Sequence, residues 1–223
     1  MTTTLLVGAV AKFSLGVIII GLLLFLPAGT VHFFNGWLLM GVLFMPMLLA
    51  GTVLMFKNPA LLKRRLAAKE TQKEQDLLVK LSGLMFLAGF MASGFGFRFH
   101  WYQFPTRVSL FAALVFLIAY GLYAEVLREN TFLSRIIEVQ EHQTVIDTGL
   151  YGIVRHPMYS ATLLLFLAMP FVLGSLYSFF IFLAYPFIIA KRIKHEEAFL
   201  ETELDGYRAY KQKVKYRLIP FIW

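Results

Sequence analysis

Residues 158–190 read MYSATLLLFLAMPFVLGSLYSFFIFLAYPFIIA and contain no charged side chain. A helix needs about 20 apolar residues to cross the hydrocarbon core of a bilayer, so this stretch is too long for one comfortable span. Pro170 and the pair Gly174-Ser175 interrupt it, and residues of this kind bend or end a helix. The stretch therefore predicts a hairpin of two short helices, 158–173 and 176–190, with a single bent helix as the alternative.

The rest of the apolar pattern predicts four more spans. Runs with few or no charges cover residues 5–27, 36–56, 81–97 and 108–124, and each is close to the length of a spanning helix. A hydrophobic content of 59% and a mean hydropathy of +0.70 exceed what a soluble fold of this size can bury. We expect an all-α, polytopic transmembrane helical bundle of about five to six membrane segments, which forms a single membrane domain over 1–223.

The basic residues orient these spans. With six crossings, 19 of the 21 Lys and Arg residues lie on the side of the N-terminus, and only Arg98 and Arg107 lie on the other side. Because Lys and Arg concentrate in cytoplasmic loops, we expect an integral, multi-pass membrane protein with cytoplasmic N- and C-termini. Treating 158–190 as one crossing would move the basic C-terminal residues outside, which favours the hairpin. The same rule explains the net charge of +8, so we expect membrane lipids as partners, and neither nucleic acid nor an obligate protein partner.

The cytoplasmic segments carry the remaining structural signals. Near residues 59–75, a Pro followed by Leu mixed with basic residues is typical of an interfacial helix. The last segment, 191–223, is rich in aromatic and basic residues and ends on Pro-Phe-Ile-Trp, so we expect a C-terminal cytosolic cap that returns to the membrane interface. The chain has no Cys, which excludes a disulfide framework, a thiolate zinc site and a Cys nucleophile.

Polar residues flank both ends of the predicted hairpin. Arg155, His156 and Tyr159 lie at its start, and Arg192 and Glu196 follow its end. The two ends of a hairpin lie close together, so we expect these residues to meet at the inner membrane face. Arg192 and Glu196 alone also fit an ordinary ion pair on a solvated helix. Cationic groups, carboxylates and aromatic faces together suit a small zwitterionic ligand, and S-adenosylmethionine has the matching parts.

Other site classes lack their signatures. No strand precedes a Gly-x-Gly-x-x-Gly motif, and Gly94-Phe95-Gly96 lies within an apolar span, so we expect no Rossmann nucleotide domain. His142 and His156 with Glu196 and Glu197 are conceivable metal ligands. Helical His-x-x-x-His and Glu-x-x-His spacings do not occur, so we expect no metal site.

Several motifs follow one another in the second half of the chain. They are Thr144-Val145-Ile146-Asp147-Thr148-Gly149-Leu150-Tyr151, Arg155-His156-Pro157-Met158-Tyr159, Arg192-Ile193 with Glu196-Glu197, Gly206-Tyr207 with Tyr210, and Arg217-Leu218-Ile219-Pro220. In this order they resemble the isoprenylcysteine carboxyl methyltransferase family and the related phospholipid methyltransferases. The match covers roughly residues 125–223, and the first half resembles the family only in its pattern of spans.

The resemblance implies a membrane enzyme that uses S-adenosyl-L-methionine. It divides the chain into N-terminal spans, 1–124, and a cofactor-binding catalytic half, 125–223. It implies Arg192 as the residue facing the methyl acceptor, so Arg192 and Glu196 are the candidate catalytic residues. The residues that it implies for cofactor contact are Gln140, Gln143, Thr144, Val145, Ile146, Tyr151, His156, Pro157, Met158, Tyr159 and Glu196.

Methyl transfer from a sulfonium is an in-line displacement that chiefly requires alignment and no nucleophilic side chain. Arg192 would orient a carboxylate acceptor, whereas an amine acceptor needs a base, for which Glu196 or Glu197 is a candidate. We expect a methyltransferase for a lipophilic acceptor, resembling protein-S-isoprenylcysteine carboxyl O-methyltransferase. The alternatives are a phospholipid or other small-lipophile methyltransferase, a sterol-reductase-like membrane enzyme that uses NADPH, and a nonenzymatic membrane binding protein.

Overall fold

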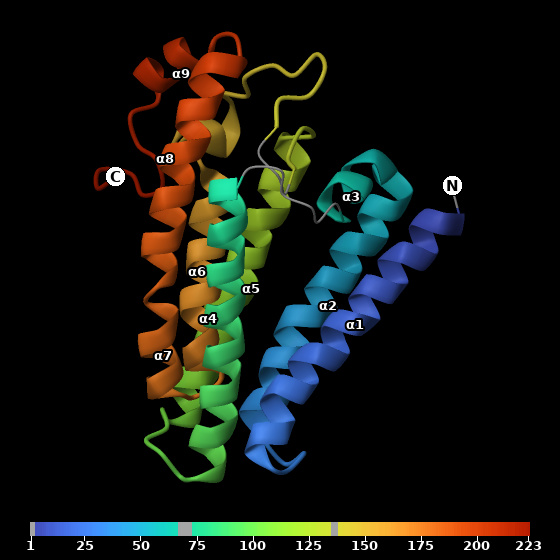
Figure 1. Cartoon of the computed structure of the whole chain (residues 1–223), viewed down its shortest axis with the longest axis vertical. Helices are drawn as coiled ribbons and strands as arrows, with labels where there is room; N and C mark the ends of the chain where they lie inside the picture. The colour runs from blue at the N-terminus through green and yellow to red at the C-terminus, as the bar shows by residue number, and fades with distance from the viewer. Residues whose placement is uncertain (1–2, 67–72, 135–137) are drawn as a thin grey trace.

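The computed structural model describes residues 3–66, 73–134 and 138–223, and within these ranges the chain is an all-α bundle, as expected (Figure 1). The segments run alternately up and down the bundle, and both ends of the chain lie toward the end that carries α9. The elements are α1 (Thr3–Ala28), α2 (Phe34–Lys57), α3 (Pro59–Leu66), α4 (Lys73–Arg98), α5 (Thr106–Glu129), the 3-10 turn η1 (Gly149–Gly152), α6 (Pro157–Val172), α7 (Leu176–Phe182), α8 (Tyr185–Glu203) and α9 (Tyr207–Lys213).

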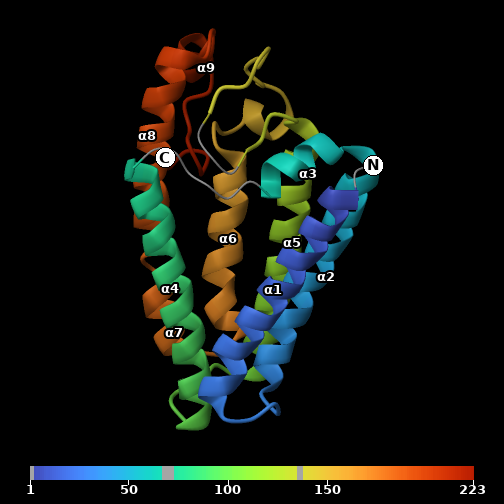
Figure 2. The same cartoon turned by 45° about the vertical axis from the view of Figure 1, so that its right-hand side comes forward.

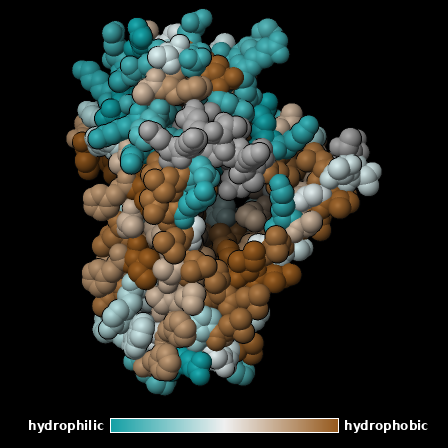
Figure 3. All heavy atoms as spheres, in the orientation of Figure 1, coloured by the Kyte–Doolittle hydropathy of each residue, from teal (hydrophilic) through white to brown (hydrophobic). Residues whose placement is uncertain are grey.

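Among the described residues, five helical segments are long and apolar enough to cross a membrane. They are α1, α2, α4 from Gln75, α5, and α7 with α8 taken together. The shorter α6 lies inside the bundle, with α4 on one side and α5 on the other (Figure 2). On the face seen in Figure 3, hydrophobic side chains cover the middle as an apolar belt, and hydrophilic ones gather at the α9 end. This distribution is the one that a multi-pass membrane protein requires.

The predicted hairpin is present, and its turn is fixed by specific contacts. The helix α6 ends at Val172, and Gly174 adopts a positive φ of 69°. A Cβ at Gly174 would lie 2.9 Å from the Asn35 side-chain nitrogen, which itself donates to the Val172 carbonyl at 2.8 Å. Ser175 then caps α7 by accepting from the Ser178 backbone N–H at 3.2 Å. Pro170 does not break its helix, since it lies within α6.

The second arm of the hairpin differs from the single helix predicted over 176–190. It is divided at Leu183 and Ala184, where α7 ends and α8 begins. Pro186 fits a break at this place. It lies in the first turn of α8, where a proline has no N–H that the preceding turn must satisfy. The helix then continues beyond residue 190 to Glu203. The arm therefore rises out of the apolar belt and carries side chains into the cap.

Close helix packing explains a glycine motif that has no part in nucleotide binding. A Cβ at Gly94 on α4 would lie 2.6 Å from the Leu24 carbonyl oxygen and 2.9 Å from Pro27 on α1. The two helices are in contact, and only a glycine allows their backbones to approach this closely. Gly94 of the Gly94-Phe95-Gly96 sequence is thus explained by the contact between α4 and α1, whereas a Cβ at Gly96 would meet Trp101 at 3.4 Å.

The predicted interfacial helix near 59–75 is described only in part. Its first section is α3, and residues 67–72 lie outside the described ranges. The last turn of the helix is held by two contacts, because Arg64 donates to the Thr131 carbonyl at 2.8 Å and Lys12 donates to the Leu66 carbonyl at 2.7 Å. In this way α3 connects the first half of the chain to the loop that follows α5.

Candidate functional site

The C-terminal segment is paired with the start of the hairpin. The backbone N–H groups of Arg155 and His156 donate to the carbonyls of Tyr216 and Arg217, both at 2.9 Å. The Arg155 guanidinium also donates to the Val214 carbonyl at 2.7 Å. Both residues at the mouth of α6 are buried. The cap therefore folds back over the hairpin and encloses its polar end.

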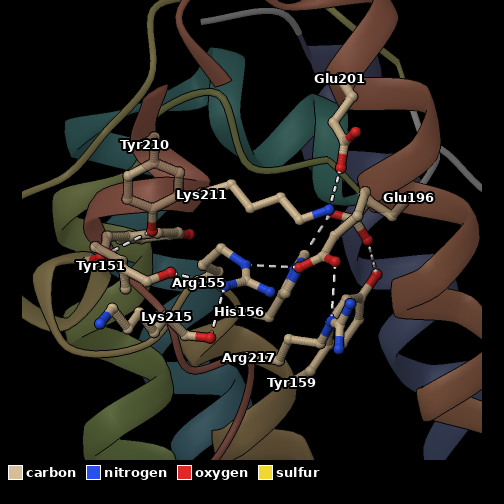
Figure 4. A network of polar contacts seen from close by, with 12 residues as sticks. Tyr151, Arg155, His156, Tyr159, Glu196, Glu201, Tyr210, Lys211, Lys215 and Arg217 are labelled. Carbon is tan, nitrogen blue, oxygen red and sulfur yellow. Dashed lines mark hydrogen bonds and ion pairs between the residues drawn. The ribbon is translucent and has the colours of Figure 1, made fainter. Parts of the chain in front are cut away.

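A single buried carboxylate joins these elements through Arg155, His156 and Arg217, which are labelled in Figure 4. Glu197 on α8 is only 2% exposed. Its Oε1 accepts from Arg155 Nε at 2.7 Å and lies 3.2 Å from His156 Nε2, and its Oε2 accepts from Arg217 Nε at 2.9 Å. A buried charge needs paired partners of this kind. Because both oxygens are engaged, Glu197 is better suited to holding the site together than to removing a proton.

The neighbouring carboxylate has a different environment. Tyr159 donates its hydroxyl hydrogen to Glu196 Oε2 at 2.5 Å and accepts from Arg192 Nε at 3.0 Å. The His156 ring stacks beside Tyr159 with 5.7 Å between ring centroids, and its Nδ1 lies 3.9 Å from Glu196 Oε1. The hairpin thus brings together the residues that the sequence placed at its two ends. Tyr159 is the link between Arg192 and Glu196.

The loop before the hairpin is fixed to the end of α5. Gly149 has a positive φ of 48°, and a Cβ there would lie 2.1 Å from Glu129 Oε1. Glu129 accepts from the Leu150 N–H at 3.1 Å, and the Tyr151 carbonyl accepts from the Tyr210 hydroxyl at 2.7 Å. Burial raises the pKa of the Tyr210 phenol, so the group stays protonated and can donate. Tyr151 is thereby held between α5 and α9.

These elements surround a cavity of about 850 Å³, counted with its open mouth, which we call the polar cavity. Its lining includes carboxylates, cationic groups, and apolar side chains of α8 and of residues 143–146. The lining residues are Asn130, Phe132, Leu133, Ser134, Glu138, Gln143, Thr144, Val145, Ile146, Tyr151, Arg155, His156, Met158, Tyr159, Arg192, Glu196, Leu200, Leu204, Tyr207 and Tyr210.

One hydroxyl in the polar cavity has no hydrogen-bond partner among the described residues. Tyr207 is 4% exposed, and its hydroxyl oxygen makes no hydrogen bond with the part of the chain that the structure describes. Burial raises the pKa of this phenol as well, so it remains a hydrogen-bond donor. A buried polar group without a partner is rare in folded proteins and marks a place where a ligand can supply one.

The structure places most of the residues implied for cofactor contact around this cavity. Gln143, Thr144, Val145, Ile146, Tyr151, His156, Met158, Tyr159 and Glu196 all line it. Gln140 and Pro157 do not. The Gln140 side chain donates to the Phe132 carbonyl at 2.6 Å and so holds the loop beneath the cavity. Pro157 is buried at the first position of α6.

Other lining residues were not singled out from the sequence. Leu200 follows Glu196 by four residues on α8, so the helical repeat was a signal that could have identified it. Leu204 comes directly after the end of α8, where this repeat no longer applies. Asn130 and Ser134 come from the loop after α5 and had no such signal, because their position depends on the packing of distant elements.

A second cavity lies deeper in the apolar belt, and we call it the membrane cavity. It measures about 790 Å³, counted in the same way, and shares Met158, Tyr159, Ser134 and Arg192 with the polar cavity. On the face seen in Figure 3 the molecule is hollowed between α4 and the side of α2 and α3. The residues that line the membrane cavity are Arg65, Leu78, Ser82, Phe86, Tyr123, Ser134, Met158, Tyr159, Thr162, Phe166, Tyr185, Ile188, Ile189 and Arg192.

The expected absence of a metal site can be examined over the described ranges only. There, no group of three or more His, Cys, Asp or Glu side chains is arranged to hold an ion. His142 is exposed, and its contact is with the equally exposed Glu141 at 3.6 Å. His156 is engaged with Glu197. The four residues considered as ligands are thus divided between the surface and the buried network.

A comparison with known families places part of the chain in a family model. Residues 106–205 match the family model described as phospholipid methyltransferase, which confirms the resemblance to membrane methyltransferases. The matched stretch runs from the start of α5 to the end of α8 and includes Tyr159, Arg192 and Glu196. A search of curated proteins finds no match.

Proposed function

We propose, with membership of this methyltransferase family as the premise, that the protein is an S-adenosylmethionine-dependent methyltransferase embedded in the membrane, acting on a lipophilic acceptor. The observation that carries the proposal is that the polar cavity and the membrane cavity meet at Tyr159 and Arg192. Group transfer requires the reacting atoms to approach to about 3–3.5 Å in the correct alignment. Two cavities of opposite character with a shared wall offer a place for a soluble donor and an apolar acceptor to meet.

The polar cavity fits the chemistry of S-adenosylmethionine. Glu138 and Glu196 can accept hydrogen bonds from ammonium or hydroxyl groups, and His156 can form a hydrogen bond with another polar group of the ligand. The Tyr207 hydroxyl, which has no partner among the described residues, can donate to a nitrogen or oxygen of the ligand. Val145 and its apolar neighbours can cover a ring. When bound, the cofactor would supply a methyl group on a positively charged sulfur.

The residues at the shared wall would position the acceptor. The Arg192 guanidinium can orient a carboxylate and leave it anionic, which is the state that attacks. The Tyr159 hydroxyl, held between Arg192 and Glu196, keeps both side chains aimed at this wall. For an amine acceptor Glu196 is the candidate base, because the oxygens of Glu197 are already occupied.

Two acceptor classes follow from this arrangement. A carboxylate resembling that of a prenylated cysteine is the first, since Arg192 lies at the shared wall. A phospholipid is the second, favoured by the description of the matching family. The apolar lining of the membrane cavity supports a lipophilic acceptor of either class, which would enter from the bilayer.

The proposed topology places the α9 end in the cytoplasm. This end gathers hydrophilic side chains, and the positive-inside rule assigns such a basic end, with both termini, to the cytoplasmic face. The soluble cofactor would then enter from the cytosol. In this proposal residues 125–223 form the cofactor-binding half, while α3 and α4 of residues 1–124 complete the acceptor side.

Binding of radiolabelled S-adenosylmethionine to the purified full chain in neutral detergent tests the proposal. We expect saturable binding by the wild type and a loss of at least tenfold in affinity for Glu196→Gln. Glu203→Gln is the matched control, because Glu203 is an exposed carboxylate on the same helix. Absence of saturable binding by the wild type, or identical affinities for wild type and Glu196→Gln, would overturn it. Methyl transfer into membrane lipids, followed by base-labile release of methanol, then distinguishes an ester product from an N-methyl product.

A further inference from the structure

Arg65, at the end of α3, is a cationic residue of the membrane cavity that comes from outside the family-matched stretch. It is partly buried. Its guanidinium donates to the Ser134 carbonyl at 3.0 Å and to the Tyr123 hydroxyl, and lies 3.9 Å from the Met158 sulfur. Each of these partners is neutral, and they are all the partners that Arg65 has among the described residues. The guanidinium charge therefore has no counterion in this part of the chain.

The membrane cavity around it has a marked charge preference. Its described lining contains two guanidinium groups, from Arg65 and Arg192, and no carboxylate. Hydroxyl donors such as Tyr123 also reach it, and the remaining wall is largely aromatic and aliphatic. A cation that lacks a counterion, as Arg65 does among the described residues, attracts anions more strongly beside low-dielectric walls than in water. Arg192 differs from Arg65, because it has partners of its own. The polar cavity differs in this respect, because Glu138 and Glu196 belong to its lining.

We propose that Arg65 binds an anionic group of the acceptor, a carboxylate or a phosphate, and so selects anionic amphiphiles over neutral and cationic ones. The inference rests on the proposed function, since it names the substrate class of the same acceptor cavity. Arginine presents a planar pair of donors that matches both anions, and such charge-assisted bonds are about twice as strong as neutral ones. The acyl part of the amphiphile lies along the apolar wall that includes Phe86 and Ile189.

Docking of α3 does not depend on Arg65 alone. Arg64 donates to the Thr131 carbonyl, Lys12 donates to the Leu66 carbonyl, and Leu61 is buried beneath the helix. These contacts persist when Arg65 is changed. A purely structural role for Arg65 would affect all amphiphiles alike, whereas an anion-binding role affects only the anionic ones.

The test compares four probes whose chains have the length and double bond of oleic acid: oleate, oleyl alcohol and oleylamine, with one chain each, and dioleoyl phosphatidic acid, with two. Their binding to the full chain in neutral detergent is measured for the wild type, Arg65→Gln, Arg65→Lys and the control Lys63→Gln. Lys63 is an exposed cation on the same helix and is outside the cavity lining. We expect the wild type to bind at least one anionic probe ten times more tightly than oleyl alcohol. In Arg65→Gln the affinity for this anionic probe falls about tenfold, or about 1.4 kcal/mol, while the affinity for oleyl alcohol is unchanged. Arg65→Lys retains part of the preference, and Lys63→Gln retains all of it.

If Arg65→Gln loses affinity for oleate alone, the anion is a carboxylate. If it loses affinity for phosphatidic acid, alone or together with oleate, the anion is a phosphate. A wild type without anion preference, or an equal loss for oleate and oleyl alcohol in Arg65→Gln, would overturn the inference. S-adenosylmethionine binding is measured on the same samples. If the wild type binds S-adenosylmethionine but shows no preference for anions, only the role of Arg65 is contradicted. If it prefers anions but does not bind S-adenosylmethionine, only the proposed methyltransferase function is contradicted.

Discussion

The substitution Glu197→Gln should open the junction between the C-terminal segment and the hairpin. It preserves the shape of the side chain but removes the charge that pairs with Arg155 and Arg217. The side chains of Glu197 and Arg155 are only 3% and 4% exposed. Removing one partner of a buried ion pair costs about 3–5 kcal/mol, because the other charge is left uncompensated. Arg217 is 27% exposed on its side chain, so water can solvate it and the lower end of that range applies.

Hydrogen exchange at the backbone amides of Arg155 and His156 measures this opening. Both amides donate to carbonyls of the C-terminal segment, so they exchange only when the segment separates or the protein unfolds. A loss of about 3 kcal/mol corresponds to exchange that is roughly a hundredfold faster. Glu196→Gln is the control, since it alters the adjacent residue but none of the bonds that close the junction.

The comparison separates the two glutamates. We expect fast exchange with Glu197→Gln and near wild-type exchange with Glu196→Gln. If Glu197→Gln accelerates exchange by less than tenfold, or if the two variants behave alike, then Glu197 does not hold the cap on the hairpin and the structural role given to it is wrong.

Two further substitutions test the cavity and the fold. Tyr207→Phe removes a hydroxyl without a partner in the described structure, so the melting temperature should stay the same or rise. The affinity for S-adenosylmethionine should fall roughly two- to tenfold, which corresponds to the loss of one hydrogen bond of about 0.5–1.5 kcal/mol. Unchanged affinity would exclude contact between this hydroxyl and the cofactor. Gly174→Ala should lower the free energy of unfolding by at least about 1–2 kcal/mol, because alanine disfavours positive φ and its Cβ would also meet Asn35 at 2.9 Å. Thermal unfolding in detergent checks this, with Gly83→Ala as the control, since a Cβ at Gly83 meets nothing within 4 Å; equal effects of the two changes would contradict the account of the turn.

The hairpin could be predicted because its signals are local. Gly174-Ser175 marks the turn, and the distribution of Lys and Arg requires an even number of membrane crossings. Because the two ends of a hairpin lie close together, the sequence also predicts that the polar residues at these ends meet. The division of the second arm was missed, although Pro186 marked it, because a proline in an apolar helix predicts either a kink or a new helix start. Which of the two occurs depends on packing around the segment.

The membrane cavity could not be predicted from the sequence. Arg65 reaches the membrane cavity only because α3 lies against the loop after α5, a contact between residues 69 positions apart in the case of Ser134. Neither a motif nor a helical period indicates such a contact. The roles of Glu196 and Glu197 were likewise indistinguishable in the sequence, because adjacent helix positions differ only in the direction that the fold gives them.

The most direct test of the central claim is transfer of the labelled methyl group of S-adenosylmethionine to membrane lipids by the wild type and by Arg192→Ala, measured alongside donor binding. We predict that the wild type produces labelled lipid, and that Arg192→Ala binds the donor with nearly unchanged affinity but loses at least a hundredfold in transfer. Donor binding and transfer that fall together in Arg192→Ala, or a wild type that binds the donor and labels no lipophilic product, would contradict the claim that two cavities meet at Arg192 to join donor and acceptor.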